Sequence, residues 1–273
     1  MFENTRFCKG EVDNDQELAK TISSHGDVFV FDAFGVSHRQ ESSTTGLMNF
    51  LDYAPGPLIQ SEVNTAKSIL EDSKKPLCTI ISGAKISTKI SLIETFSDKA
   101  DHLILGGGLL NTYLQCKGFE VGVSLVERDL SQEVLSFFES ESAKKIIMPT
   151  DLVCSADASL DYPKTKSISM VQSNDKILDI GTKSIERYTE IIKKSSTVFW
   201  NGPLGYVEKK PYDKGTESII NVLADANCYS VIGGGDTVSV IENMGVQDKI
   251  SYISTGGGAV SYTHLRAHET VVH

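Results

Sequence analysis

The chain has 273 residues, of which 40% are hydrophobic and 23% charged, a composition that fits one large α/β domain or two smaller ones. Its formal net charge of −10 disfavours nucleic-acid binding, which requires a basic surface to neutralise phosphates. No apolar run is long enough to span a membrane and the first residues lack the apolar core of a signal peptide, so a cytoplasmic protein without membrane contact is expected.

Short apolar, β-branched runs alternate with longer amphipathic stretches, a pattern typical of parallel strands joined by helices. It predicts an α/β fold in which a Rossmann-like parallel sheet carries helices on both faces. In chain order, the expected strands are 27–34, 77–82, 102–106, 145–149, 197–201, 229–233 and 250–254.

Helices are expected between these strands. Asp13 and Gln16 have the spacing of a capping box and predict a helix start that leads into residues 17–23. Helical periodicity also covers 56–72, 131–143 and 215–226. The polar, turn-rich residues 154–175 predict a loop or a short hairpin.

Glycine triplets follow three of the expected strands, at 106–108, 233–235 and 256–258. Each fixed glycine costs about 0.5–1 kcal/mol relative to alanine, so three triplets imply a use. Glycines at the carboxyl edge of a parallel sheet let the backbone approach a phosphate, and the following helix offers free N–H groups. The alternative is a tight strand-to-helix turn, but the repetition favours ligand contact.

Two familiar phosphate motifs are missing. A dinucleotide fingerprint would need a third glycine where Asn111 and Val238 stand, which disfavours a nicotinamide-dependent oxidoreductase. The Gly-Lys pair of a Walker loop occurs nowhere in the chain. A nucleotide site built on these glycines would therefore be of another type.

Lys85 and Lys89 lie four residues apart, just after an expected strand and Gly83. If a helix begins near Ser87, both ammonium groups reach the mouth of one cleft, where they can neutralise phosphate charge. The alternative is a solvated helix face.

Polar groups also follow the strands at 197–201 and 229–233. Asn201-Gly202-Pro203 predicts a rigid turn, or else a pre-shaped loop that holds a nucleotide together with Glu208. Asp236 either caps its helix or holds Mg²⁺.

Two arginines are candidate anion ligands near the start of the chain. His38 and Arg39 lie on an expected loop after a strand, where an arginine can bind a carboxylate or phosphate with two hydrogen bonds. Arg6 is a weaker candidate by itself.

Taken in order, these stretches resemble the phosphoglycerate kinase family, especially its bacterial form. The matching segments are ENTRF, DAFGVSHRQESSTTG, GAKISTKI, LGGGLLNTYL, LDIG, WNGPLGYVE, GGGDT and YISTGGGA, which together run from residue 3 to residue 259. The resemblance implies a monomeric glycolytic enzyme that moves a phosphoryl group reversibly from 1,3-bisphosphoglycerate to ADP with Mg²⁺, giving 3-phosphoglycerate and ATP. Such direct transfer needs positioning and charge neutralisation but no protein nucleophile.

The resemblance also assigns roles to positions of this chain. Lys85 and Arg39 are implied to be catalytic, and Arg6, His38 and Arg39 to bind the phosphoglycerate. The implied nucleotide-binding residues are Gly83, Lys85, Lys89, Gly107, Gly108, Asn201, Gly202, Pro203, Gly205, Glu208, Gly233, Gly234, Gly235, Asp236 and Thr237. Gly256, Gly257 and Gly258 correspond to a phosphate loop, and Asp236 to the metal-side carboxylate.

The implied organisation has two lobes, of which the first is incomplete. Residues 1–55 would be the remainder of the phosphoglycerate-binding lobe, 56–72 a helix joining the lobes, 73–259 the nucleotide lobe and 260–273 an atypical, non-native tail. Family members begin well before ENTRF with further substrate-binding residues and a catalytic arginine, and Ser82 replaces a common glycine. We therefore expect a chain truncated at both ends with impaired activity. The alternative is a non-catalytic fragment that binds ADP or ATP.

Overall fold

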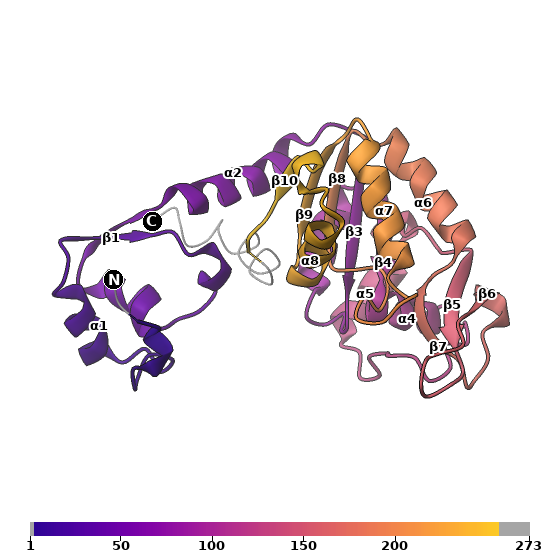
Figure 1. The fold of residues 1–273 in the computed structure, drawn as a ribbon, viewed down its shortest axis with the longest axis horizontal. Coiled ribbons are helices and arrows are strands. Elements are labelled where there is room, and N and C mark those ends of the chain that lie inside the picture. Colours follow the sequence, from indigo (N-terminus) through magenta and orange to yellow (C-terminus); the bar gives the residue numbers. More distant parts are fainter. Residues whose placement is uncertain (1–2, 257–273) are drawn as a thin grey trace. The chain divides into compact units, whose positions relative to one another are not determined.

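Residues 3–256 are described by a computed structural model, in which the chain divides into two units (Figure 1). The first unit comprises Met1–Ser68 and Thr255–His273, and the second comprises Ile69–Ser254. The domain boundaries expected from the sequence remain predictions, and the expected tail at 260–273 lies outside the described residues. No helix within residues 3–256 is both long and apolar enough to cross a bilayer.

The first unit contains a small parallel sheet and several short helices. Its elements are η1 (Thr5–Phe7), α1 (Gln16–Ser23), β1 (Val28–Phe31), η2 (Phe34–Val36), η3 (Ser42–Gly46), η4 (Leu47–Asn49), β2 (Asp52–Pro55) and α2 (Pro57–Asp72). Strand β1 pairs with β2 in parallel. The division between the units falls after Ser68, within α2.

The start of α1 differs from the expected one. Asp15, not Asp13, is the N-cap, and its Oδ1 accepts the N–H of Leu18 at 2.8 Å. Asp13 instead lies in a turn whose N–H groups at positions 13 and 15 both donate to the carbonyl of Gly10. The turn displaces the helix start by two residues, which a capping-box spacing alone does not reveal.

The second unit is built on a parallel sheet. Within the described residues this sheet has five strands in the order β10-β9-β8-β3-β4. Their bounds are β3 (Leu77–Gly83), β4 (His102–Gly106), β8 (Thr197–Asn201), β9 (Tyr229–Gly233) and β10 (Tyr252–Ile253). A separate antiparallel sheet consists of β6 (Lys164–Ser167), β5 (Asp151–Ser155) and β7 (Lys176–Ile180), in that order.

Helices cover both faces of the parallel sheet, as expected from the sequence (Figure 1). They are α3 (Ile90–Lys99), α4 (Gly107–Cys116), α5 (Gln132–Glu139), α6 (Thr182–Lys194), α7 (Lys214–Asp225) and α8 (Gly235–Met244), with the short turns η5 (Ser142–Lys145), η6 (Ile168–Met170) and η7 (Gln247–Lys249). The crossovers β3-α3-β4 and β8-α7-β9 leave the sheet centre in opposite directions. Because such crossovers are right-handed, α3 and α7 lie on opposite faces.

The centre of the sheet forms the core. Every residue of β8 is buried, as is β3 except at its last residue. Phe96 of α3 stacks on Phe199 of β8 with ring centroids 4.2 Å apart. The next residue, Trp200, is fully buried on the opposite side of the strand.

Several expected elements differ from the observed ones. The strand predicted at 145–149 is wrong: Lys145 ends η5, and a single bridge joins Ile146 to Leu103. Pro149 has no N–H to extend that ladder. The strand predicted at 250–254 shortens to β10, and the helix predicted at 131–143 ends at Glu139. Strands β2, β5 and β7 were not predicted, and the polar stretch 154–175 contains β6 as one arm of a hairpin with β5.

The stacked pair in the core gives a stability prediction. Phe199→Ala should lower the free energy of unfolding by about 3–5 kcal/mol, because it removes the ring on which Phe96 packs. Urea unfolding followed by circular dichroism measures this change. Val123→Ala, at a side chain of the second unit that is 63% exposed, should change stability by less than about 0.5 kcal/mol. Equal effects of the two substitutions would contradict this account of the core.

Candidate functional site

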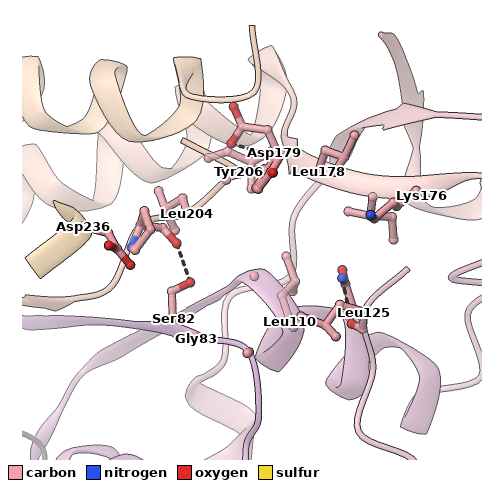
Figure 2. A pocket seen from close by; sticks show the side chains of 18 of the residues that line it. Ser82, Gly83, Leu110, Leu125, Lys176, Leu178, Asp179, Leu204, Tyr206 and Asp236 are labelled. Carbon is pink, nitrogen blue, oxygen red and sulfur yellow. Dashed lines mark hydrogen bonds between the residues drawn. The ribbon is translucent and has the colours of Figure 1, made fainter. Parts of the chain in front are cut away.

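A pocket of about 370 Å³ lies at the carboxyl ends of the parallel strands (Figure 2). Chain order reverses between β3 and β8, since β4 lies on one side of this pair and β9 on the other. Open α/β sheets bind ligands at such a switch point. The pocket is lined by Ser82, Gly83, Ala84, Gly107, Gly108, Leu110, Asn111, Leu125, Lys176, Ile177, Leu178, Asp179, Ile180, Pro203, Leu204, Gly205, Tyr206, Glu208 and Asp236.

The first glycine triplet joins β4 to α4 at this edge. Gly106 ends the strand, and Gly107 has φ +58°, which a side chain would strain. At Gly108 a Cβ atom would lie 2.2 Å from the carbonyl oxygen of Ala84. The triplet therefore lets the turn after β4 approach the turn after β3. The backbone of these two turns forms part of the pocket lining.

Hydrogen bonds and a close backbone contact fix the turn after β8. Gly202 has φ +90°, and a Cβ there would lie 2.4 Å from the carbonyl oxygen of Ser82. The indole N–H of Trp200 donates to the carbonyl of Gly202 at 2.6 Å. The hydroxyl of Ser82 donates to the carbonyl of Pro203 at 2.5 Å (Figure 2). Ser82 thus ties the end of β3 directly to the loop 202–208.

Lys89 lies at the same place and is partly buried. Its Nζ donates to Asn201 Oδ1 and to the carbonyl of Ser82, both at 2.5 Å. Burial lowers the pKa of this ammonium to about 8, and the negative charge of Asp236 opposes the shift. The site therefore holds a poorly solvated cation that a further anion would stabilise.

The helix start considered for Lys85 and Lys89 differs from the observed one. Helix α3 begins at Ile90 instead of near Ser87, residues 87–89 form a turn, and the two lysines do not share a helix face. Lys85 is exposed, and its charge contributes to lowering the pKa of Glu127, whose carboxylate accepts the N–H and hydroxyl of Ser87. Lys89, in contrast, bonds to Asn201 at the end of β8.

The second glycine triplet joins β9 to α8. Gly233 ends the strand and Gly234, with φ +96°, is the N-cap of α8, so Asp236 is not the capping residue. Asp236 is exposed and lines the pocket (Figure 2). The helix N-terminus adds free N–H groups and a positive dipole end.

Buried polar atoms beside this helix end lack partners. Thr237 Oγ1 and Asn201 Nδ2 are buried and form no hydrogen bond in the part of the chain that the structure describes. Buried polar atoms are normally satisfied by a protein group, a water or a ligand. These two atoms are therefore candidates for ligand or solvent contact.

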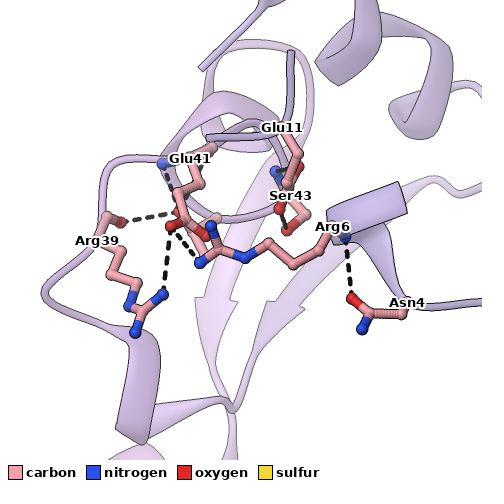
Figure 3. Close-up of polar contacts among 7 residues, drawn as sticks. Asn4, Arg6, Glu11, Arg39, Glu41 and Ser43 are labelled. Carbon is pink, nitrogen blue, oxygen red and sulfur yellow. Dashed lines mark hydrogen bonds and ion pairs between the residues drawn. The ribbon is translucent and has the colours of Figure 1, made fainter. Parts of the chain in front are cut away.

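The first unit brings the two candidate arginines together (Figure 3). A single oxygen of Glu41, Oε1, lies 2.6 Å from an Arg6 nitrogen and 3.7 Å from an Arg39 nitrogen. The Glu41 side chain is 12% exposed, against 37% for Arg6 and 45% for Arg39. His38 directly precedes Arg39 in the chain and is exposed.

The third glycine triplet is described only at its first residue. Gly256 belongs to the first unit, and Gly257 and Gly258 lie outside the described residues. The preceding Thr255 donates its N–H and hydroxyl to Glu62 Oε1 at 2.8 and 2.9 Å. A phosphate-binding role for this triplet remains a prediction.

The sequence analysis did not predict one wall of the pocket. Strand β7 supplies Lys176, Leu178 and Asp179. Tyr206, in the loop after β8, donates its N–H to the carbonyl of Leu178 at 2.8 Å. The run KILDI was a usable signal, because it is apolar, contains two isoleucines and ends at Gly181.

Comparisons with known proteins give the family of this chain. A model of the family described as phosphoglycerate kinase matches residues 1–264. The chain belongs to the phosphoglycerate kinase family. Its function is accordingly the reversible transfer of a phosphoryl group from 1,3-bisphosphoglycerate to ADP, and its substrates are a nucleotide and a phosphoglycerate.

Solved structures show the same fold. The phosphoglycerate kinase from Coxiella burnetii is similar with a TM-score of 0.83 and 37% identity, and that from Pyrococcus horikoshii OT3 with a TM-score of 0.78 and 26% identity. Each match covers 96% of this chain and 68% of the other. The match supports the two-lobed α/β architecture expected from the sequence.

The contacts of Lys89 give a binding prediction. Lys89→Met should weaken ADP binding at least about tenfold, because it removes the cation nearest the end of β8 while keeping the length of the side chain. Isothermal titration calorimetry measures the Kd. Lys144→Met, at a side chain that is 71% exposed and pairs with Glu141, should leave the Kd unchanged. Unaltered binding by Lys89→Met would show that this ammonium does not face the nucleotide.

Proposed function

We propose that the pocket of the second unit binds ADP and ATP. The observation that carries this proposal is the position of the pocket, at the switch point between β3 and β8, where Gly107 and Gly108 of the first triplet and Asp236, directly after the second triplet, line it. Its apolar wall, which includes Leu110, Leu125 and Leu178, suits a base. Glu208, exposed at the rim, accepts hydrogen bonds from the ribose hydroxyls.

The nucleotide phosphates are bound where α8 begins. Gly233, Gly234 and Gly235 let them approach the backbone, and Thr237 offers a buried hydroxyl that has no partner among residues 3–256. Lys89 neutralises part of their charge, which in turn favours its protonated form. Gly83, Gly107, Gly108, Asn201, Gly202, Pro203 and Gly205 shape the remaining walls.

The phosphoglycerate is bound in the first unit by Arg6, His38 and Arg39. The two guanidinium groups already converge on Glu41, which shows that they can hold one carboxylate oxygen together. Arg39 and Lys85 act in the transfer itself by neutralising charge on the moving phosphoryl group. Lys85, being exposed and free of the α3 ladder, has the side-chain freedom for that contact.

A magnesium ion fits the residues at the pocket rim. Mg²⁺ keeps several waters and usually takes one or two protein carboxylates besides substrate phosphates. Asp236 supplies one exposed carboxylate at the helix end, and no group of three or more His, Cys, Asp or Glu side chains that could form a closed metal cage occurs within residues 3–256. Bound with the nucleotide, the ion would offset phosphate charge.

The metal assignment is tested by calorimetry with and without Mg²⁺. Removing Mg²⁺ should weaken ADP binding by wild-type protein, and Asp236→Asn should abolish that difference, because the amide loses the charge that attracts the cation. Asp225→Asn, at an exposed carboxylate that pairs with Lys249 at the end of α7, should retain the full Mg²⁺ effect. A normal Mg²⁺ effect in Asp236→Asn would exclude this residue as the ligand.

We propose further that these 273 residues by themselves transfer the phosphoryl group slowly, as a monomer in the cytoplasm. Both arginines assigned to the phosphoglycerate are engaged by Glu41, so substrate must compete with an internal carboxylate. Weakening one preorganised electrostatic contact costs on the order of 10²–10³ in rate.

A coupled assay with the purified 273-residue chain tests this proposal. Turnover should fall far below the roughly 1–100 s⁻¹ typical of kinases. A rate within that range would overturn the expected impairment. ADP binding without detectable turnover would instead favour a chain that only binds nucleotide.

A further inference from the structure

We infer that Asp179 is a positioning residue, which holds the loop 202–208 and the start of α7 in the arrangement that the nucleotide needs. The inference rests on the proposed nucleotide site. Asp179 lies in β7, lines the pocket and is 3% exposed (Figure 2). It touches the segments that form the pocket wall, and no role in the reaction has been assigned to it above.

The carboxylate joins two backbone segments by hydrogen bonds. Its Oδ2 accepts the N–H of Gly215 in the first turn of α7 at 2.7 Å, and its Oδ1 accepts the N–H of Ile180 at 2.8 Å. The N–H of Gly215 is one of those that a helix start leaves without an internal partner. Asp179 thereby anchors the first turn of α7 to β7.

Two glycines allow this close approach. A Cβ at Gly205 would lie 2.4 Å from Asp179 Oδ1, and a Cβ at Gly215 would lie 2.3 Å from the same oxygen. Gly205 belongs to the loop that carries Pro203 and Glu208 on the pocket rim. The carboxylate therefore packs against the loop backbone and bonds to the helix backbone at the same time.

Burial of a negative charge on Asp179 costs free energy. Within residues 3–256 no basic side chain forms an ion pair with Asp179, and the neighbouring Asp213 adds a second negative charge, itself paired with Lys210. Burial, with a smaller contribution from Asp213, raises the pKa of Asp179 from 3.8 to about 7, while the two backbone N–H groups oppose the shift. A neutral side chain would avoid this cost, so the carboxylate is better explained by the geometry that it imposes on the loop and α7.

The chain contains a matched control at the start of another helix. Asp151 is 5% exposed and accepts the N–H groups of Ser184 and Lys183 in α6 at 2.8 and 3.2 Å. A Cβ at Gly181 would lie 2.3 Å from its Cγ, so a glycine permits close approach here as well. Asp151 has the same chemistry as Asp179 but does not line the pocket.

The experiment compares ADP binding and thermal stability in four variants, Asp179→Asn, Asp179→Ala, Asp151→Asn and Asp151→Ala. Asparagine keeps the size and one acceptor oxygen, whereas alanine removes both acceptors. We expect the Kd for ADP to rise at least about fivefold in Asp179→Asn and more than about tenfold in Asp179→Ala. The Asp151 variants should lower the Tm but keep the Kd within about twofold of wild type.

The outcomes separate the inference from the proposed nucleotide site. If wild-type protein does not bind ADP, the nucleotide site itself is wrong. If wild type binds ADP and Asp179→Asn binds it equally well, only the positioning role is wrong. Equal losses of affinity in folded Asp179 and Asp151 variants would also overturn it, because they would show a general loss of structure. Should Asp179→Ala fail to fold, the asparagine pair alone decides.

Discussion

The backbone carbonyl of Ser82 is the point on which the arrangement of the nucleotide pocket depends. It accepts Lys89 Nζ at 2.5 Å, and Gly202 approaches it so closely that a Cβ would lie 2.4 Å away. The side chain of the same residue donates to the carbonyl of Pro203. One residue at the end of β3 thus positions both the Lys89 ammonium and the loop after β8. This close contact explains why glycine with positive φ follows Asn201.

Lys89, beside the pocket, and Asp179, in its wall, are stabilised in different ways. Lys89 loses solvation but gains two acceptors, and the pKa falls to about 8, so a phosphate nearby would restore part of the lost stabilisation. Asp179 has only backbone donors, and its pKa rises to about 7. Because the pKa of Asp179 is about 7 in the folded protein and 3.8 for an ordinary aspartate, the protein loses stability as the pH rises between these two values. At neutral pH the ionised Asp179 therefore lowers the stability of the protein while it fixes the backbone geometry.

The sequence predicted the sheet edge well and the side-chain orientations poorly. Strand ends at Gly106 and Gly233 were predictable because glycine triplets follow apolar runs, and both triplets lie where expected. The orientation of Lys89 was not predictable, because it depends on where α3 begins. That helix begins at Ile90, and no side chain caps its start. Strand β7 was missed because Asp179 interrupts a short apolar run, although that aspartate is buried by its backbone bonds.

Ser82, which stands where the family resemblance implies a common glycine, has a structural part in this arrangement. A Cβ at Gly106 would lie 2.8 Å from Ser82 Oγ, and a Cβ at Gly107 would lie 3.0 Å from it, so the hydroxyl fills space that glycine leaves open at the junction of β4 and α4. With a glycine at position 82, the carbonyl of Pro203 would lose this donor, and the loop would keep its bonds to Trp200 and Thr216. The serine therefore adds a side-chain link across the switch point, and the glycine triplet after β4 makes room for it as well as for a ligand.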